Sequence, residues 1–293
     1  MLSMQSYVII TDSTADLSQK MIEEMGVDVK RMTYSMDGEE FSDIPVERDD
    51  KIKQFYAALR SGSRSSTSQI NMDVFTESFK SYLEQGKDVL YIGFSSALSG
   101  TCSQAVAAAN KLKLHYPDRK IFAVDSLCAS LGQGLLVYYA AQLQKNGAAI
   151  EDTVSFLEKN KLHLCHWFTV DDLNHLKRGG RVSATVALLG TVLGIKPILH
   201  VDDEGRLIPM GKVRGRRASL DELVKKAEQT MMHPEDQTVF ISHGDCIDDA
   251  EYVADKVKEK LHVKDVKINY IGPVIGSHSG PGTVALFFMG TKR

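Results

Sequence analysis

Short runs of hydroxyl-bearing residues follow apolar segments at four places in the first half of the chain. The runs are Thr11–Thr14, Ser65–Gln69, Ser95–Thr101 and Asp125–Ser126. Hydroxyl groups, and the free N–H groups at the start of a helix, suit a small anionic or polar group. Because serine and threonine are also common helix caps, capping alone explains any single run. Four runs together indicate a binding site for a phosphate, a carboxylate or a carbonyl group.

Two further segments add positive charge or a titratable ring. Leu176–Ser183 (LKRGGRVS) places three cations around a Gly-Gly bend. The C-terminal end of a helix explains the first two cations, because they complement the helix dipole there, but it does not explain Arg181 beyond the cap. Gly276–Gly282 (GSHSGPG) is either a tight turn or a loop of small residues that lets a ligand approach His278 closely.

One segment, Lys212–Arg217 (KVRGRR), is locally basic, although the formal net charge of the chain is −3 at pH 7. Such a segment is either a solvated strand end or a docking surface for a partner protein or an anionic membrane surface. Its cations are Lys212, Arg214, Arg216 and Arg217. The overall charge provides no general attraction to nucleic acid, so we expect no nucleic-acid partner.

Alternating strands and helices are predicted to position the hydroxyl-rich runs. Short apolar segments in the first half are typical of strands, each followed by a helical pattern. They are Tyr7–Thr11, Val27–Met32, Val89–Gly93 and Ile121–Asp125. This alternation predicts an α/β domain with a parallel sheet flanked by helices, in which the carboxyl ends of the strands bring loops together.

The second half follows a different pattern, which indicates antiparallel pairing. Ile195–Val201 and Arg206–Val213 flank the turn Asp202–Gly205 and are predicted to form a hairpin. Strands are also predicted at Leu164–Val170, Thr238–Ser242, Val266–Ile271 and Thr283–Met289, with helices near 220–231 and 248–262. We therefore expect a C-terminal α+β domain with a mixed or antiparallel sheet. The predicted domains are residues 1–161 and 162–293.

The composition fits a globular protein with room for a cavity. The 293 residues are 43% hydrophobic and 25% charged, and a chain of this length forms two domains of ordinary size. The uncharged stretch Ala184–Gly194 is either a buried helix or the lining of a cavity or gate for an aliphatic ligand. The four cysteines include no C-x-x-C pair, and we find neither a signal peptide nor a membrane-spanning apolar run. We expect a cytoplasmic, reduced protein.

Seven motifs, taken together, resemble the DegV family. They are TDSTADLS (Thr11–Ser18), STSQ (Ser66–Gln69), FSSALSGT (Phe94–Thr101), VDSLCASLGQG (Val124–Gly134), LKRGGRVS (Leu176–Ser183), IKPIL (Ile195–Leu199) and HSGPG (His278–Gly282). Each motif alone is weak, but the seven occur in the order and spacing of the family and span essentially the whole chain.

This resemblance implies a carrier that performs no chemistry itself and needs no cofactor. The family fold holds one long-chain fatty acid in a tunnel. A separate fatty acid kinase subunit, similar to dihydroxyacetone kinases, phosphorylates the bound acid to an acyl phosphate for phospholipid synthesis. The basic segment Lys212–Arg217 is then interpreted as the docking surface for that kinase or for transient contact with a membrane.

The resemblance also implies a head-group site. Carried onto this sequence, the carboxylate ligands are hydroxyls of Ser66 or Thr67 and of Ser95 or Ser96, with His278 nearby. Arg181 matches the Gly-Gly-Arg of the family and is expected to orient or neutralise the head group. The sequence departs from the family at Ile70, where proline is usual, and at Cys102, where an aromatic residue is usual. We expect these departures to change loop rigidity and chain preference rather than to remove the site.

A Ser/His-dependent lipid hydrolase or acyl-transfer enzyme is the main competing interpretation. In such an enzyme Ser96 or Ser99 is the nucleophile and His278 is the base. The nucleophile elbow of such enzymes needs G-x-S-x-G, and Gly93–Ala97 (GFSSA) lacks the second glycine.

A dinucleotide site and a metal site find less support in the sequence. The glycines of Gly132–Gly134 lie inside a predicted helix rather than at a strand-to-helix turn, so they do not form a dinucleotide fingerprint. A metal site at His163, Cys165 and His166 is disfavoured because successive residues of a strand point to opposite faces, so only His163 and Cys165 share a side. A strand in the core is the better interpretation of that segment.

Overall fold

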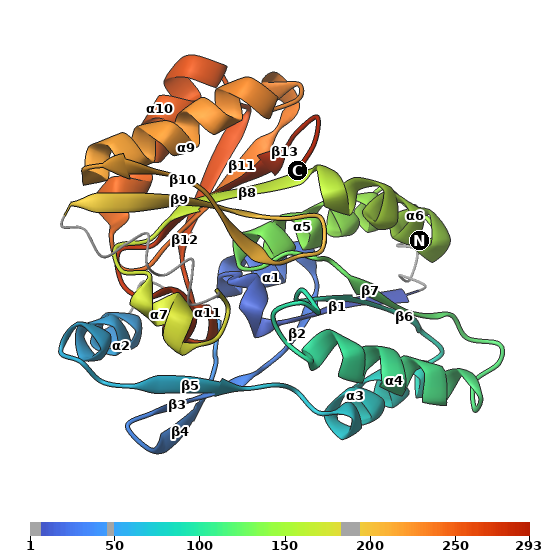
Figure 1. The fold of residues 1–293 in the computed structure, drawn as a ribbon. Coiled ribbons are helices and arrows are strands. Elements are labelled where there is room, and N and C mark those ends of the chain that lie inside the picture. Colours follow the sequence, from blue (N-terminus) through green and yellow to red (C-terminus); the bar gives the residue numbers. More distant parts are fainter. Residues whose placement is uncertain (1–6, 46–49, 183–193) are drawn as a thin grey trace.

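The computed structural model describes residues 7–45, 50–182 and 194–293. Figure 1 shows the helix α5 (Leu131–Lys145) near the centre of the molecule, between the two larger sheets. The apolar stretch Ala184–Gly194 lies outside the described residues except for its last glycine. Within the described ranges, none of the helices combines the length and the apolar character that a membrane crossing requires.

A four-stranded parallel sheet forms the first part of the chain, in the order β2-β1-β6-β7. Its strands are β1 (Tyr7–Asp12), β2 (Asp28–Lys30), β6 (Asp88–Gly93) and β7 (Ile121–Asp125). The helices beside it are α1 (Gln19–Met25), α3 (Met72–Glu84), α4 (Thr101–Lys113) and α6 (Ile150–Asn160). Because successive residues of a strand face opposite sides of the sheet, Ile10 and Tyr91 pack in one core with α3 and α4. Ile9 and Leu90 pack in another core with α1 and α5.

A six-stranded mixed sheet forms the second part, in the order β10-β9-β8-β13-β11-β12. Its strands are β8 (Leu164–Thr169), β9 (Ile195–Val201), β10 (Leu207–Arg214), β11 (Thr238–His243), β12 (Asp265–Tyr270) and β13 (Val284–Met289). Only β11 and β12 pair in parallel among these described strands. The helices α9 (Arg216–Thr230) and α10 (Ile247–Leu261) cover one face, and α5 packs against the other. The predicted parallel and mixed sheets are thus confirmed, whereas the boundary at residue 161 stays a prediction.

The helix α5 is buried along most of its length because it packs against both sheets. Two of its glycines permit this close approach. A Cβ at Gly132 would collide with the His166 ring, and one at Gly134 would lie 2.8 Å from the carbonyl oxygen of Ala15. These glycines therefore serve helix packing, and the Gly132–Gly134 segment offers no phosphate-binding turn.

A third, small antiparallel sheet was not expected from the sequence. It contains β3 (Thr33–Met36), β4 (Glu39–Ser42) and β5 (Ser65–Ser68), in the order β4-β3-β5. The prediction of a loop at Ser65–Gln69 is thus wrong for its first four residues. Polar side chains make up all of β5, so the sequence has no apolar alternation that would reveal a strand.

Short helices surround this small sheet and connect it to the rest of the molecule. They are α2 (Asp50–Arg60), α7 (Asn174–Arg178), α11 (Pro273–Ser279) and the 3-10 helix η1 (Ser13–Ala15). Two other 3-10 helices, η2 (Lys161–His163) and η4 (Pro234–Asp236), lie directly before β8 and β11 of the six-stranded sheet. The prediction of a loop around His278 is wrong, because His278 lies in the last turn of α11. Pro273 begins this helix with its fixed backbone angle, a signal that the small residues after it obscured.

A buried carboxyl group, that of Asp16, joins the two parts of the chain. Its side chain accepts hydrogen bonds from the hydroxyl of Ser130 and from the N–H of Gly272, the latter at 2.9 Å. The Ser130 hydroxyl also lies 2.9 Å from that of Ser242 on β11. Burial raises the pKa of Asp16 to about 7, and the charge of Asp12 raises it as well, while the two hydrogen bonds lower it.

We predict that Asp16→Asn removes part of the pH dependence of folding. A carboxyl group that titrates near 3.8 when unfolded and near 7 when folded binds more protons in the folded state, so stability falls as pH rises between these values. Asparagine resembles the protonated form. In urea unfolding, the variant should be more stable than the wild type at pH 8, and the difference should vanish towards pH 4.

Asp37→Asn is the matched control for this prediction. The pKa of Asp37 is lowered by hydrogen bonds from the side chain of Ser63 and the backbone of Arg64, so its substitution should give no stabilisation at pH 8. A difference between Asp16→Asn and the wild type that stays constant across the pH range would contradict the prediction.

Candidate functional site

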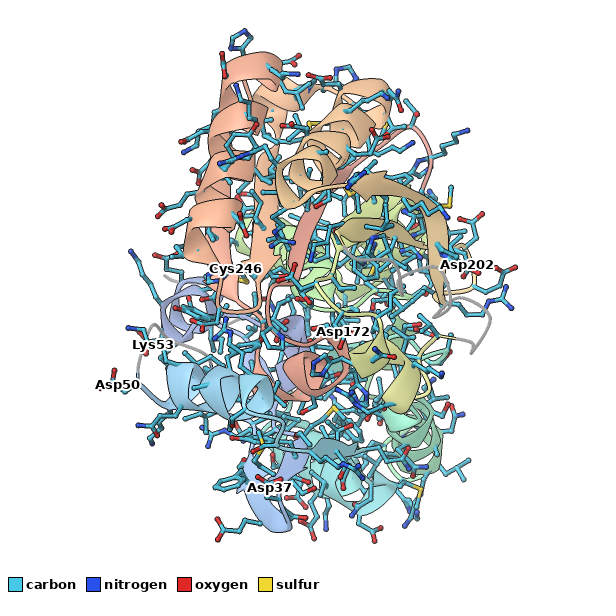
Figure 2. All side chains as sticks on the ribbon, turned by 60° about the vertical axis from the view of Figure 1, so that its left-hand side comes forward. Asp37, Asp50, Lys53, Asp172, Asp202 and Cys246 are labelled. Atoms are coloured by element: carbon cyan, nitrogen blue, oxygen red, sulfur yellow. The ribbon has the colours of Figure 1, made fainter. Side chains whose placement is uncertain are left out.

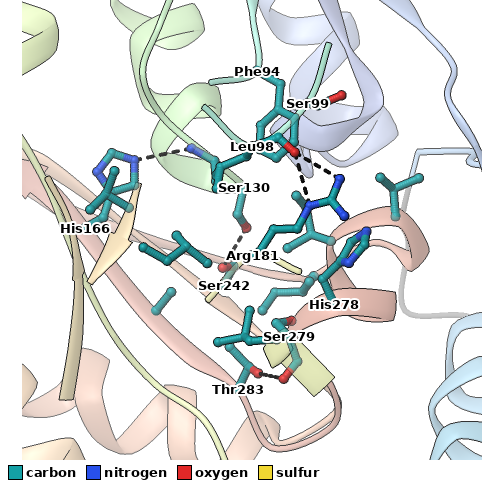
Figure 3. A pocket seen from close by; sticks show the side chains of 18 of the residues that line it. Phe94, Leu98, Ser99, Ser130, His166, Arg181, Ser242, His278, Ser279 and Thr283 are labelled. Atoms are coloured by element: carbon teal, nitrogen blue, oxygen red, sulfur yellow. Dashed lines mark hydrogen bonds between the residues drawn. The ribbon is translucent and has the colours of Figure 1, made fainter. Parts of the chain in front are cut away.

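A cavity of about 290 Å³ lies between the two parts of the chain. Its walls are mainly apolar, and they include Phe94 and Leu98 from the first part and Leu176, Val274 and Phe287 from the second. Figure 3 shows Arg181 and His278 together at one side of the cavity and His166 at the opposite side. An apolar chain with one polar end fits such a space.

At the polar end, a hydrogen bond joins Thr67 of β5 to His278 of α11. The Thr67 hydroxyl lies 2.9 Å from His278 Nε2. Burial lowers the pKa of His278 to about 4, and the positive charge of Arg181 contributes, so the ring is neutral at pH 7. His278 Nδ1 is buried and has no hydrogen-bond partner among the described residues.

The charged side chain at this end is that of Arg181. Its Nε and Nη2 donate to the carbonyl oxygen of Leu98 at 3.1 and 3.0 Å, and its Nη1 donates to that of Gly179. Burial lowers the pKa of Arg181, but a guanidinium remains a cation at pH 7. No aspartate or glutamate lines the cavity, and Arg181 forms no ion pair within the described ranges. The charge at the polar end therefore favours an anion.

Ser99 and Gln69 also line the polar end, although neither was among the predicted carboxylate ligands. The Ser99 hydroxyl lies 3.0 Å from that of Thr101 and accepts the Thr101 N–H, at the start of α4. A Cβ at Gly100 would collide with Gln69 Oε1, which indicates close contact between the two loops. Its place before a glycine and a helix start was the signal that could have identified Ser99.

The structure does not bring Ser66, Ser95 or Ser96 to the cavity. The buried Ser95 hydroxyl donates to the carbonyl oxygen of Gly205 at 2.9 Å, so it supports the β9–β10 turn. Ser96 is exposed. Ser66 is exposed too, and its hydroxyl lies 2.8 Å from that of Ser35, because neighbouring residues of a strand face opposite sides and Thr67 takes the inner one. Of the predicted ligands, Thr67, Arg181 and His278 are brought together.

The predicted docking cations differ in how much they are engaged within the chain. Lys212 and Arg214 are exposed on β10, an edge strand. The Arg217 guanidinium is exposed and lies 3.7 Å from the ring centroid of Tyr252. Arg216 forms an ion pair with Asp249 at 2.8 Å, so its positive charge is already balanced within the chain.

A hydrolase site and a metal site lack the geometry that they need among the described residues. His278 bonds to Thr67, and the Ser99 hydroxyl bonds to Thr101, so neither predicted serine is paired with the histidine as a nucleophile would be. Both ring nitrogens of His166 contact backbone groups, at 3.2 Å to the oxygen of Leu164 and 3.4 Å to the nitrogen of Ala129. This engagement leaves no ring nitrogen of His166 for a metal ion.

Comparisons with known proteins give consistent matches over nearly the whole chain. The family model described as "Uncharacterised protein, DegV family" matches residues 6–291. A DegV domain-containing protein of Clostridium perfringens is 47% identical over 290 residues, which cover 99% of each chain.

Two solved structures share the fold closely. A DegV lipid binding protein of Thermotoga maritima has a TM-score of 0.83 at 31% identity, and the match covers 98% of this chain and 99% of that one. A DegV family protein of Thermus thermophilus, described by its fatty acid binding, has a TM-score of 0.86 at 30% identity, with 96% and 98% covered. The parallel and mixed sheets described above match these structures.

We predict that Gly179→Ala destabilises the protein through His278. An added Cβ would collide with His278 Nδ1, and overpacking of this kind costs about 1–3 kcal/mol. The midpoint of urea unfolding should fall for the single variant. In a His278→Ala background the same substitution should cost little, because the clash is gone.

Gly211→Ala, at a position with no atom within 4 Å of the added Cβ, is the control and should leave the unfolding midpoint nearly unchanged. An equal cost of Gly179→Ala with and without His278 would show that the contact is not the cause.

Proposed function

The chain belongs to the DegV family, and on that premise we propose that it binds one long-chain fatty acid. The acyl chain fills the apolar cavity, and the carboxylate lies at the polar end against Thr67, Arg181 and His278. One observation carries the proposal: a cation without an acidic partner among the described residues stands at the end of an apolar cavity. Relatives that share the fold are described as lipid-binding and fatty-acid-binding proteins.

The energetics of the cavity support a tightly held acyl chain. Each buried methylene contributes about 0.8 kcal/mol, so some fifteen contribute about 12 kcal/mol before costs. Association and ordering remove a substantial part of this free energy. The cavity of about 290 Å³ is close to the lower end of the range for small-molecule sites, about 300 Å³.

The chemistry of the polar end suits a carboxylate that must remain reactive. Burying a carboxylate without partners is costly, so hydrogen-bond donors must meet it. Three N–H donors of Arg181 already form hydrogen bonds with backbone carbonyl groups. Arg181 therefore supplies positive charge near the carboxylate rather than a full pair of hydrogen bonds to both of its oxygens. Hydroxyl groups and a neutral histidine leave carboxylate oxygens free to act as nucleophiles.

From this arrangement we infer that the protein is a carrier rather than an enzyme. It presents the carboxylate to a separate fatty acid kinase, similar to dihydroxyacetone kinases, which forms an acyl phosphate. The exposed cations Lys212, Arg214 and Arg217 form the docking surface for that kinase and reach a membrane surface only transiently. Arg216 is excluded from this surface because of its ion pair.

We predict that the purified protein carries a fatty acid. Denaturation and extraction with organic solvent, followed by mass spectrometry, should release about one long-chain acid per protein chain. An empty extract combined with no binding of added palmitate or oleate would overturn the carrier function.

The proposed head-group site is tested by measuring the palmitate affinity of two hydroxyl variants. Thr67→Val removes a hydroxyl from the polar end and keeps the shape, so palmitate affinity should fall by about tenfold or more, as for a hydrogen bond to a charged group. Ser66→Ala removes the neighbouring exposed hydroxyl and should leave affinity unchanged. Equal losses in the two variants would contradict the proposed head-group site.

We predict that reversing the charge of the docking surface slows phosphorylation by the kinase. Lys212→Glu combined with Arg214→Glu should reduce the rate of acyl phosphate formation by about tenfold at low kinase concentration, because electrostatic steering is lost. Palmitate affinity should not change. Lys113→Glu, on the exposed side of α4, is the control, and an equal slowing in that variant would reject this surface.

A further inference from the structure

A pair of buried hydroxyl groups interrupts the apolar wall of the cavity between its two ends. Ser130, directly before α5, and Ser242, on β11, both line the cavity. Figure 3 shows them between His278 at one side of the cavity and His166 at the opposite side. The Ser242 hydroxyl lies 2.9 Å from that of Ser130, which in turn donates to the carboxyl group of Asp16. An acyl chain that extends from one end of the cavity to the other therefore passes these hydroxyl groups.

The fold places Ser242 among apolar neighbours and leaves space beside it. Phe240, two residues earlier on β11, packs in the core with α5, and the alternation of the strand turns Ser242 to the same face. Ala285 lies directly opposite on β13 and also lines the cavity. Because the side chains of Ser242 and Ala285 are both small, this part of the wall has room for a substituent on the acyl chain.

The Ser242 hydroxyl is able to form a further hydrogen bond in either arrangement of the protons. Within the described ranges its one hydrogen-bond partner is Ser130. When Ser130 donates to Asp16, Ser242 donates to Ser130, and the Ser242 oxygen remains able to accept. With a proton on Asp16 the directions reverse, and the Ser242 hydroxyl is left to donate. A hydroxyl group on a ligand fits both arrangements, whereas a ketone, which only accepts, fits the second alone.

The surrounding charge favours a neutral group at Ser242 rather than the carboxylate of the ligand. The buried carboxyl group of Asp16 lies behind Ser130, and the charge of Asp12, which is also buried, acts on it. Carboxyl groups in such a place disfavour a further anion. The carboxylate of a fatty acid therefore remains at the end of the cavity that holds Arg181.

We propose that the cavity takes a hydroxylated fatty acid, in which the hydroxyl group on the acyl chain binds Ser242. The proposal rests on the function proposed above and narrows the class of its ligand. Burying a hydroxyl group without a partner costs free energy, so a cavity built only for hydrocarbon binds such an acid about tenfold or more weakly than the unsubstituted one. The free hydrogen-bonding capacity of Ser242 removes this penalty for a hydroxyl group that reaches it.

The test compares stearate with monohydroxystearates that carry the hydroxyl group at each carbon from six to fourteen. Binding of each acid to the delipidated full-length protein is measured by calorimetry. At one position, or at two neighbouring positions, the hydroxylated acid should bind at least as tightly as stearate. At the remaining positions the unpaired hydroxyl group should weaken binding by about tenfold or more.

The variant Ser242→Ala should weaken binding of the matching hydroxystearate by about tenfold and leave stearate within about twofold. A loss of folded protein lowers the number of sites for both acids and does not change the ratio of their affinities. Ser219→Ala is the matched control, because the buried Ser219 hydroxyl donates to the carbonyl oxygen of Arg216 and does not line the cavity. Ser219 lies on α9, in the helix layer at the top of Figure 2, and its substitution should change neither affinity.

The outcomes separate this proposal from the carrier function. If every hydroxystearate binds about tenfold or more weakly than stearate, the site at Ser242 is rejected and fatty acid binding stands. Equal losses for both acids in Ser242→Ala, or a tight hydroxystearate complex that survives this substitution, would also overturn the proposal. If the wild type binds neither stearate nor any hydroxystearate, the carrier function itself fails.

Discussion

The guanidinium of Arg181 is the interaction on which the polar end of the cavity depends. It joins the loop that contains Leu98 to the turn at Gly179, and these segments come from different parts of the chain. Its charge also helps to keep His278 neutral. A cation that is held by backbone carbonyl groups keeps its charge available, since carbonyl oxygens accept hydrogen bonds without neutralising it. The Arg181 side chain thus joins the segments that form the polar end of the cavity, and its positive charge favours a negatively charged ligand group there.

Much of the fold could be predicted because its strands are apolar and its helices periodic. Tyr7–Asp12 and Val284–Met289 are buried along nearly their whole length, so their pattern is visible in the sequence. The small sheet was missed for the opposite reason. Its strand β5 consists of hydroxyl residues, and it exists because β3 pairs with it rather than because of any preference of its own.

The residue types of the site could be predicted from the sequence, but which side chains point into the cavity could not. Thr67, Arg181 and His278 follow from the motifs, and the structure brings them together. Which of two adjacent hydroxyls points inward depends on strand pairing and on the position of the β9–β10 turn, which lie far away in sequence. That turn takes the Ser95 hydroxyl, and Ser99 lines the cavity in its place. Local sequence therefore does not show which hydroxyl of an adjacent pair faces inward, since that depends on these distant segments.

The cavity lies where the two parts of the chain meet, so an occupant acts as a piece of the core. On the proposed function, the free energy of lipid binding adds to that of folding by mass action, since the unfolded chain has no such cavity. A loaded chain is then harder to unfold than an empty one, and proteases act on the unfolded population. The lifetime of the protein in a cell would therefore rise and fall with the supply of its lipid, even at a constant rate of synthesis.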